Sequence, residues 1–132
     1  MRFTFSYTGI RVRDFERSLR FYRDLLGMKV LRRSKDADTR GEWAILESEA
    51  GGQTLEVNWY EEGSPFGGPY GVGEAVDHLA FRVDEFDAAV AYLSAAGHPT
   101  VLGPTDDGRY RVAYVEDPDG ITVEIFHVRD RP

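Results

Sequence analysis

The chain has 132 residues, of which 42% are hydrophobic, and carries a formal net charge of −7. This length suffices for one domain or for two small fused modules. The chain has no cysteine, which excludes disulfides, thiol nucleophiles and cysteine-based zinc sites. Its negative charge argues against a nucleic-acid partner. Because no apolar run approaches the roughly 20 residues of a membrane span and the N-terminus lacks a signal-peptide pattern, we expect a cytoplasmic protein with no membrane partner.

The first elements that the pattern predicts are a strand near residues 3–13 and a helix directly after it. Ile10 and Val12 share one face of the strand, as period-2 alternation requires. Asp14 is the predicted N-cap and Gly27 the predicted helix end. Between them, apolar residues recur at helical spacing and form one stripe: Phe15, Leu19, Tyr22 and Leu26.

Three further strands are predicted near residues 28–36, 41–49 and 53–60. The segment EEGSPFGGPYGVG at 61–73 contains five glycines and two prolines, which excludes regular secondary structure. It is the predicted connector between two modules, and it is long enough to form a flap over a site.

The second half repeats the order of the first. A strand at 76–83 precedes a helix from Asp84 to Ala96, with Phe86, Val90 and Leu93 as its apolar stripe and Gly97 at its end. Strands follow near 99–103, 109–117 and 121–128, the last two joined by a turn at 117–120.

The predicted fold class is therefore α+β, with tandem βαβββ modules that form curved, mainly antiparallel sheets around a cleft, and helices outside. The predicted organisation is a first module at 1–60, a linker at 61–74 and a second module at 75–132.

Superposing the two halves places Tyr7 opposite His78 and Glu56 opposite Glu124. Strand alternation directs these side chains away from the helices, toward the concave face. A carboxylate in the middle of a β-branched strand requires a partner when buried, and one histidine with carboxylates from separate strands suits a divalent metal. The alternative is that each glutamate points into solvent from an open sheet face.

Four segments together resemble the vicinal oxygen chelate superfamily: YTGIRVRDFERSLRFYRDLLGM at 7–28, LEVNWY at 55–60, DHLAFRV at 77–83 and VEDPDGITVEIF at 115–126. This superfamily includes glyoxalase I, extradiol dioxygenases, fosfomycin-resistance and bleomycin-resistance proteins and methylmalonyl-CoA epimerase. The resemblance covers essentially the whole chain and is closest in motif to the glyoxalase I branch.

The resemblance implies a divalent metal ion, Ni, Zn, Mn or Fe, with Glu56, His78 and Glu124 as ligands. Tyr7 occupies the fourth ligand position, where the family usually has His or Gln. It either completes the ligand set or hydrogen-bonds a carboxylate, a bound water or the substrate. By the same resemblance Glu124 is the catalytic base and Arg11 holds an anionic substrate, while Asn58 adds a polar contact to it.

The function implied is that of a glyoxalase I-like, metal-dependent lyase or isomerase, which acts on a small oxygenated substrate through a metal-stabilised enediolate. One alternative is a metal-free, antibiotic-sequestering protein of the bleomycin-resistance type, and another is an extradiol-type dioxygenase. Similar proteins of this length form homodimers, and the sequence leaves open whether the site lies in one chain or is shared with a partner.

Two further histidines and several aromatic residues complete the sequence-based predictions. His98 and His127 are predicted to be structural or exposed, because His98 follows the helix end and His127 has the opposite strand parity to Glu124. The candidate pocket walls are aromatic: Trp43, Trp59, Phe66, Tyr70, Tyr110 and Phe126.

Overall fold

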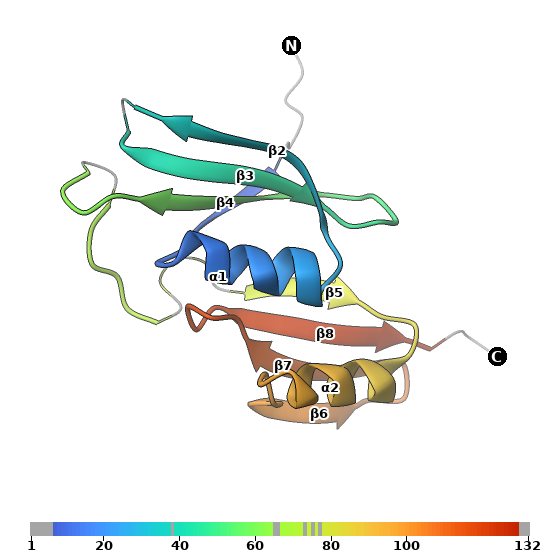
Figure 1. Cartoon of the computed structure of the whole chain (residues 1–132). Helices are drawn as coiled ribbons and strands as arrows, with labels where there is room; N and C mark the ends of the chain where they lie inside the picture. The colour runs from blue at the N-terminus through green and yellow to red at the C-terminus, as the bar shows by residue number, and fades with distance from the viewer. Residues whose placement is uncertain are drawn as a thin grey trace, which may run out of the picture. The chain divides into compact units, whose positions relative to one another are not determined.

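The structure is a computed structural model and describes residues 7–37, 39–64, 67–72, 74, 76 and 78–129. The chain divides into two compact units, Met1–Gly71 and Val72–Pro132, here called unit 1 and unit 2. Each unit contains one four-stranded sheet and one helical segment (Figure 1). The strand orders are β1-β4-β3-β2 in unit 1 and β5-β8-β7-β6 in unit 2. Because these orders correspond strand for strand, the predicted α+β fold of two βαβββ modules is confirmed.

Unit 1 consists of β1 (Tyr7–Arg11), α1 (Phe15–Leu19), η1 (Arg20–Leu25), β2 (Lys29–Asp36), β3 (Gly41–Glu47) and β4 (Thr54–Tyr60). β1 and β4 pair in parallel, whereas β2–β3 and β3–β4 are antiparallel. The mainly antiparallel sheet is as the sequence predicts. β1 ends at Arg11, two residues before the predicted end, and residues 3–6 lie outside the described part of the chain.

The first helix begins and ends where the sequence predicts. The Asp14 side chain accepts a hydrogen bond from the Arg17 backbone N–H over 3.0 Å, which satisfies a donor that the first turn leaves open. Gly27 follows the helix with φ +73, a conformation that favours glycine. The second half, η1, is a π-helix, in which the Leu26 N–H donates to the Phe21 carbonyl at 3.0 Å.

Unit 2 consists of β5 (His78–Arg82), α2 (Phe86–Ala95), β6 (Leu102–Asp106), β7 (Tyr110–Glu116) and β8 (Thr122–Val128). β5 and β8 are parallel, and the other pairs are antiparallel. The prediction of a strand at 99–103 is wrong by three residues. Pairing with β7 starts only at Leu102, opposite Tyr114, and β6 tolerates Pro104 because it lies at the sheet edge.

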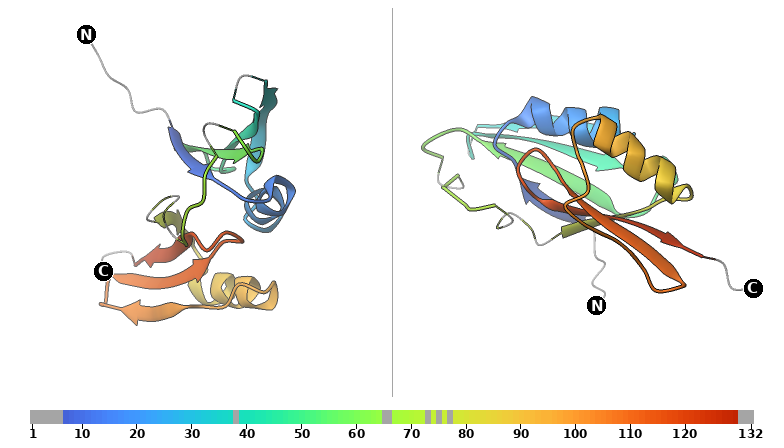
Figure 2. Two further views of the ribbon diagram at one scale, coloured as in Figure 1. Left: turned by 90° about the vertical axis from the view of Figure 1, so that its left-hand side faces the viewer. Right: turned by 90° about the horizontal axis from the view of Figure 1, so that it is seen from below.

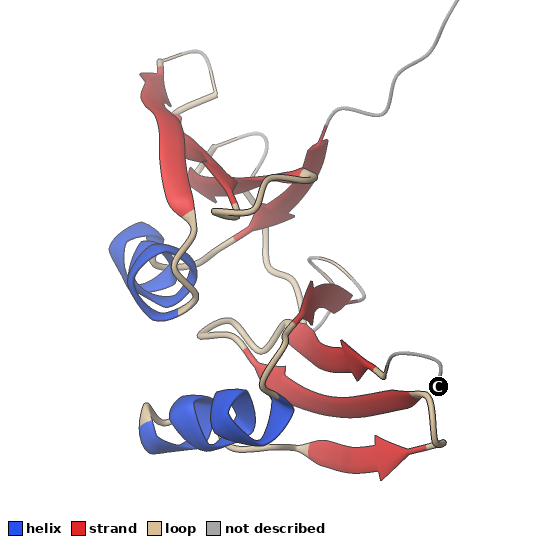
Figure 3. Cartoon of the chain, turned by 90° about the vertical axis from the view of Figure 1, so that its right-hand side faces the viewer, coloured by secondary structure: helices blue, strands red, loops and turns tan. Residues whose placement is uncertain are grey.

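The central strand of each sheet buries alternate residues. Leu55 and Val57 of β4, and Val123 and Ile125 of β8, are buried. These strands are the ones that α1 and α2 contact in their own units, and each helix lies next to its own sheet (Figure 2 and Figure 3). Alternation therefore turns Glu56 and Glu124 to the opposite face, away from the helix. None of the helices that the structure describes is long and apolar enough to cross a membrane.

Candidate functional site

The equivalent positions predicted from the sequence occupy matching places in the two sheets. In unit 1, β1 pairs with β4 so that Tyr7 lies opposite Thr54 and Gly9 opposite Glu56. In unit 2, His78 lies opposite Thr122 and Ala80 opposite Glu124. Each glutamate thus lies opposite a very small residue on the neighbouring parallel strand, and this residue is two positions beyond Tyr7 or His78.

Unit 2 brings two of the predicted metal ligands together. The Nε2 atom of His78 lies 3.7 Å from the Oε2 atom of Glu124. His78 is exposed and Glu124 is half-buried. Two donor atoms that each bind one ion at about 2.0–2.2 Å lie roughly 3–4 Å apart, so this imidazole–carboxylate pair fits a divalent transition metal in spacing and in chemistry.

Unit 1 contributes the third predicted ligand. Glu56 is half-buried on β4, and Tyr7 is 44% exposed on β1. Among the residues that the structure describes, no group of three or more His, Asp or Glu side chains gathers closely enough to hold a metal ion. The full ligand set of Glu56, His78, Glu124 and Tyr7 therefore remains a prediction.

A pocket of about 620 Å³ opens in unit 1 at the end of β1 and β4, a volume typical of small-molecule sites. Arg11, a predicted substrate residue, lines it together with Trp59 and Tyr70, so two of the predicted aromatic walls are confirmed as pocket-lining. The guanidinium carbon of Arg11 lies 4.5 Å from the centre of the Tyr70 ring. Asn58 donates from Nδ2 to the Ile10 carbonyl at 3.3 Å and so links β4 to β1.

The remaining aromatic candidates lie elsewhere. Trp43 lies on unit 1 beside Arg32, whose guanidinium carbon is 5.4 Å from the centre of the Trp43 ring. Tyr110 is 39% exposed on β7, and Phe126 is half-buried on β8. Phe66 lies outside the described residues.

The sequence analysis missed Arg13 as a pocket residue. It lines the same pocket as Arg11, and its guanidinium carbon lies 4.4 Å from the centre of the Tyr70 ring. The available signal was parity, since residues 11 and 13 share a face of an extended chain. Tyr114, Leu102 and Val101 were missed as well: with His78 and Thr122 they line a pocket of about 450 Å³ in unit 2, which gives the His78 imidazole apolar neighbours.

The other two histidines are structural, as predicted. His98 Nδ1 lies 2.8 Å from the Glu116 carbonyl. His127 Nδ1 lies 2.9 Å from the Val83 carbonyl. Each ring thereby connects two segments of unit 2.

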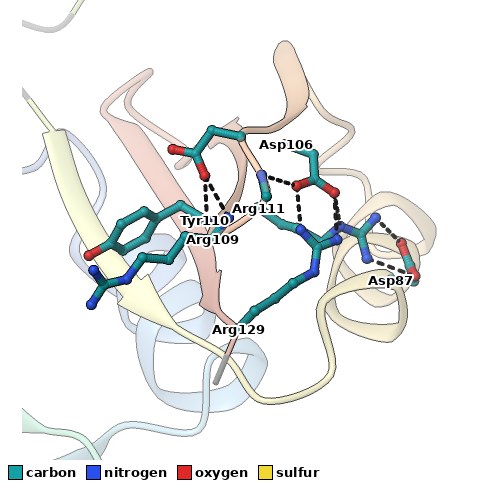
Figure 4. A network of polar contacts seen from close by, with 8 residues as sticks. Asp87, Asp106, Arg109, Tyr110, Arg111 and Arg129 are labelled. Atoms are coloured by element: carbon teal, nitrogen blue, oxygen red, sulfur yellow. Dashed lines mark hydrogen bonds and ion pairs between the residues drawn. The ribbon is translucent and has the colours of Figure 1, made fainter. Parts of the chain in front are cut away.

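A network of ion pairs lies away from the predicted ligands, at the β6–β7 hairpin (Figure 4). Asp106 pairs with Arg129 and also accepts from the Gly108 backbone N–H. These contacts hold the pKa of the Asp106 carboxyl far below its usual range. Arg111 forms a two-pronged pair with Asp87, at 3.1 and 2.8 Å, which lowers the pKa of Asp87. This network ties the hairpin to α2 and to the end of β8.

Comparisons with known proteins agree with this geometry. The family model of the glyoxalase/bleomycin resistance protein/dioxygenase superfamily matches residues 4–125. The lactoylglutathione lyase of Haemophilus influenzae is 34% identical, over 91% of this chain and 89% of that protein. A second lactoylglutathione lyase, from Neisseria meningitidis, is 35% identical over 91% of this chain and 87% of its own length.

Solved structures also resemble this chain. The trypanothione-dependent glyoxalase I of Leishmania major is 28% identical with a TM-score of 0.74, covering 96% of this chain and 87% of that one. TnmS3, an antibiotic-binding protein of Streptomyces, is 23% identical with a TM-score of 0.73, over 98% of this chain and 99% of its own; at this identity it shows a shared fold alone. The match over nearly the whole chain, on the duplicated βαβββ topology, shows that this chain belongs to the glyoxalase/bleomycin resistance protein/dioxygenase superfamily, with glyoxalase I-like proteins among its relatives.

Proposed function

We propose that this protein is a glyoxalase I-like lyase that depends on a divalent metal ion. The observation that carries the proposal is the His78–Glu124 pair at 3.7 Å, in a chain about one third identical to lactoylglutathione lyases over nine tenths of its length. The metal-free binding alternative is not proposed, because its support is a fold likeness at 23% identity.

The substrate class follows from the name of these relatives. A lactoyl thioester is the isomer of the hemithioacetal that a thiol forms with a 2-oxoaldehyde. One proton leaves the carbon that bears sulfur and hydroxyl, and one proton is delivered to the adjacent carbonyl carbon. The hydroxyl proton is likewise lost, and the former carbonyl oxygen gains a proton, so that the product is an isomer of the substrate. No oxidant or reductant is needed, so a base and a means of stabilising the enediolate charge suffice.

The residues of this chain take the following proposed roles. Glu56, His78 and Glu124 hold the ion, with Tyr7 as a fourth ligand or as a hydrogen-bond partner of the substrate or of a bound water. An ion held by these residues would supply Lewis-acid chemistry, polarising a carbonyl and stabilising negative charge on its oxygen. Glu124 takes the proton from the substrate carbon and returns it to the neighbouring carbon, while Glu56 is the more permanent ligand. Arg11 binds an anionic group of the thiol moiety, and Asn58 adds a polar contact. We further propose a cytoplasmic homodimer.

The first test replaces the proposed base. In Glu124→Gln the carboxylate is lost while the side-chain size is kept, so kcat for conversion of the methylglyoxal–glutathione hemithioacetal should fall about 10²–10⁴-fold. The measurement is the rate of thioester formation with nickel, zinc, manganese or iron present. Glu116→Gln is the matched control, because Glu116 is an exposed carboxylate on the neighbouring strand β7 and should keep the wild-type rate. Wild-type rates in Glu124→Gln would contradict the assignment of the base, and a metal-replete wild-type protein without thioester formation would contradict the proposed reaction.

A further inference from the structure

A loop residue of unit 1, Tyr70, contacts two arginines near the end of β1. Arg11 is the last residue of this strand, and Arg13 follows two positions later. The centre of its ring is 4.5 Å from the guanidinium carbon of Arg11 and 4.4 Å from that of Arg13. The Tyr70 hydroxyl donates to the Arg11 carbonyl at 3.1 Å. In return, Arg13 Nη2 donates to the Tyr70 carbonyl at 2.7 Å. These four contacts join one aromatic ring to two cationic side chains.

The contacts with Tyr70 restrain two long side chains, those of Arg11 and Arg13. A guanidinium is attracted to the face of a tyrosine ring, and an arginine loses rotamer entropy when it is immobilised. Because Tyr70 orders the two arginines before a ligand binds, less side-chain entropy is lost on binding. Both guanidinium groups carry a positive charge, so an anion bound beside them would be attracted by both.

Both arginines line the pocket of about 620 Å³, together with Trp59, Tyr60 and Tyr70. Two acidic residues also line it, Glu61 and Glu62. The Glu61 carboxylate is engaged by Arg40 Nε at 3.1 Å. The same arginine donates to the carbonyls of Glu62 and Gly63, both at 3.3 Å, so this rim of the pocket is held in place by its own cation. The pocket thus combines flat aromatic walls with a restrained guanidinium pair.

We propose that Tyr70 is a positioning residue that holds Arg11 and Arg13 as one anion-binding pair, and that Arg13 binds a second anionic group of the substrate. The ligand class is a thiol conjugate with at least two carboxylates, one for each guanidinium. Arginine suits this task because its planar fork binds a carboxylate through two hydrogen bonds. The inference rests on the proposed function for the role of Arg11 and extends it to Arg13 and Tyr70.

The test compares Arg13→Gln, Tyr70→Leu and Tyr70→Phe with the wild-type protein. The readouts are KM and kcat for the methylglyoxal–glutathione hemithioacetal, and the calorimetric Kd for S-hexylglutathione, which is not turned over. Arg13→Gln should raise KM and Kd about 10–100-fold, the loss expected for hydrogen bonds to a charged group, with a much smaller change in kcat. Its Kd should also depend less on salt than that of the wild type.

Tyr70→Leu should raise both constants in the same direction, because the ring that restrains both arginines is lost. Tyr70→Phe keeps the ring and loses only the hydroxyl bond to the Arg11 carbonyl, so it should stay within a few-fold of the wild type. Arg32→Gln is the matched control: Arg32 also lies against an aromatic ring, that of Trp43 at 5.4 Å, but does not line this pocket. It should leave KM, kcat and Kd unchanged.

The outcomes separate this inference from the proposed function. Unchanged KM and Kd in Arg13→Gln would overturn the inference even if the wild-type protein forms thioester. Equal losses in Tyr70→Phe and Tyr70→Leu would overturn the positioning role of the ring. If the wild-type protein forms no thioester but binds S-hexylglutathione in an Arg13-dependent manner, the proposed reaction fails and the anion-binding pair stands.

Discussion

At the scale of single residues, Asp106 is a carboxylate whose ionised form is stabilised by its hydrogen-bond partners. Its pKa is lowered first by the hydrogen bond with Arg129 and then by the backbone N–H of Gly108. The ionised form is therefore favoured in the folded chain. Because the folded pKa lies below the unfolded value of about 3.9, the stabilisation is complete above that value and is lost as the pH falls toward the folded pKa.

The Asp106→Asn variant should accordingly show a shallower loss of stability in acid than the wild-type protein. Near neutral pH it should lose about 1–3 °C in Tm, since exposed ion pairs contribute little and are screened by salt. As the pH falls below about 4, the difference in Tm between the two proteins should shrink. Thermal unfolding from pH 7 to pH 2 measures this, with the exposed Glu49→Gln as control. Parallel curves over the whole range would show that Asp106 does not contribute to the acid sensitivity.

At the scale of secondary-structure elements, the two units use the same order of strands but start their helices differently. Asp14 caps α1 with its side chain. Glu85 occupies the N-cap of α2 and makes no side-chain capping hydrogen bond. The duplicated topology is therefore kept while the local means of starting the helix differs. Both helices bury an apolar pair, Phe15 and Leu19 in α1 and Phe86 and Leu93 in α2.

This difference supplies an internal control for the capping interaction. Asp14→Ala should lower the free energy of unfolding by about 1 kcal/mol, because the Arg17 N–H loses its acceptor. Glu85→Ala, at the equivalent position of unit 2, should change it by less than about 0.5 kcal/mol. Urea unfolding followed by circular dichroism measures both. Equal effects at the two positions would show that the Asp14 hydrogen bond adds nothing to helix stability.

At the scale of the whole molecule, metal binding and folding stability should be coupled. An ion that binds the folded chain but not the unfolded chain stabilises the fold. The gain is about 2.7 kcal/mol when the free ion concentration is 100 times its Kd. We expect nickel or zinc to raise the Tm of metal-stripped protein, and this shift to disappear in His78→Ala. His98→Ala should keep the shift, because His98 bonds to the Glu116 carbonyl and is not a proposed ligand. A shift that survives in His78→Ala would place the ion elsewhere.

Local patterns account for the parts of the fold that the sequence predicts well. The helix limits at Asp14, Gly27 and Gly97 depend on capping chemistry and positive φ, which neighbouring residues determine. Buried and half-buried residues alternate along the first five residues of β4 and of β8, so the two faces of these strands follow from the residue order. The equivalence of Tyr7 to His78, and of Glu56 to Glu124, follows in the same way from the repeated sequence pattern.

The residue order by itself determined the duplicated α+β fold, the face that each glutamate occupies and the superfamily, because periodicity and motif spacing act over short stretches of chain. The tertiary structure alone decided the limits of β6, which depend on pairing with β7, and the 3.7 Å approach of His78 to Glu124. It also decided the contact of Tyr70 with Arg11 and Arg13. The residues of the last two contacts lie far apart in sequence, and no local propensity encodes the loop closure that brings them together; the limits of β6 instead depend on cross-strand pairing within one hairpin.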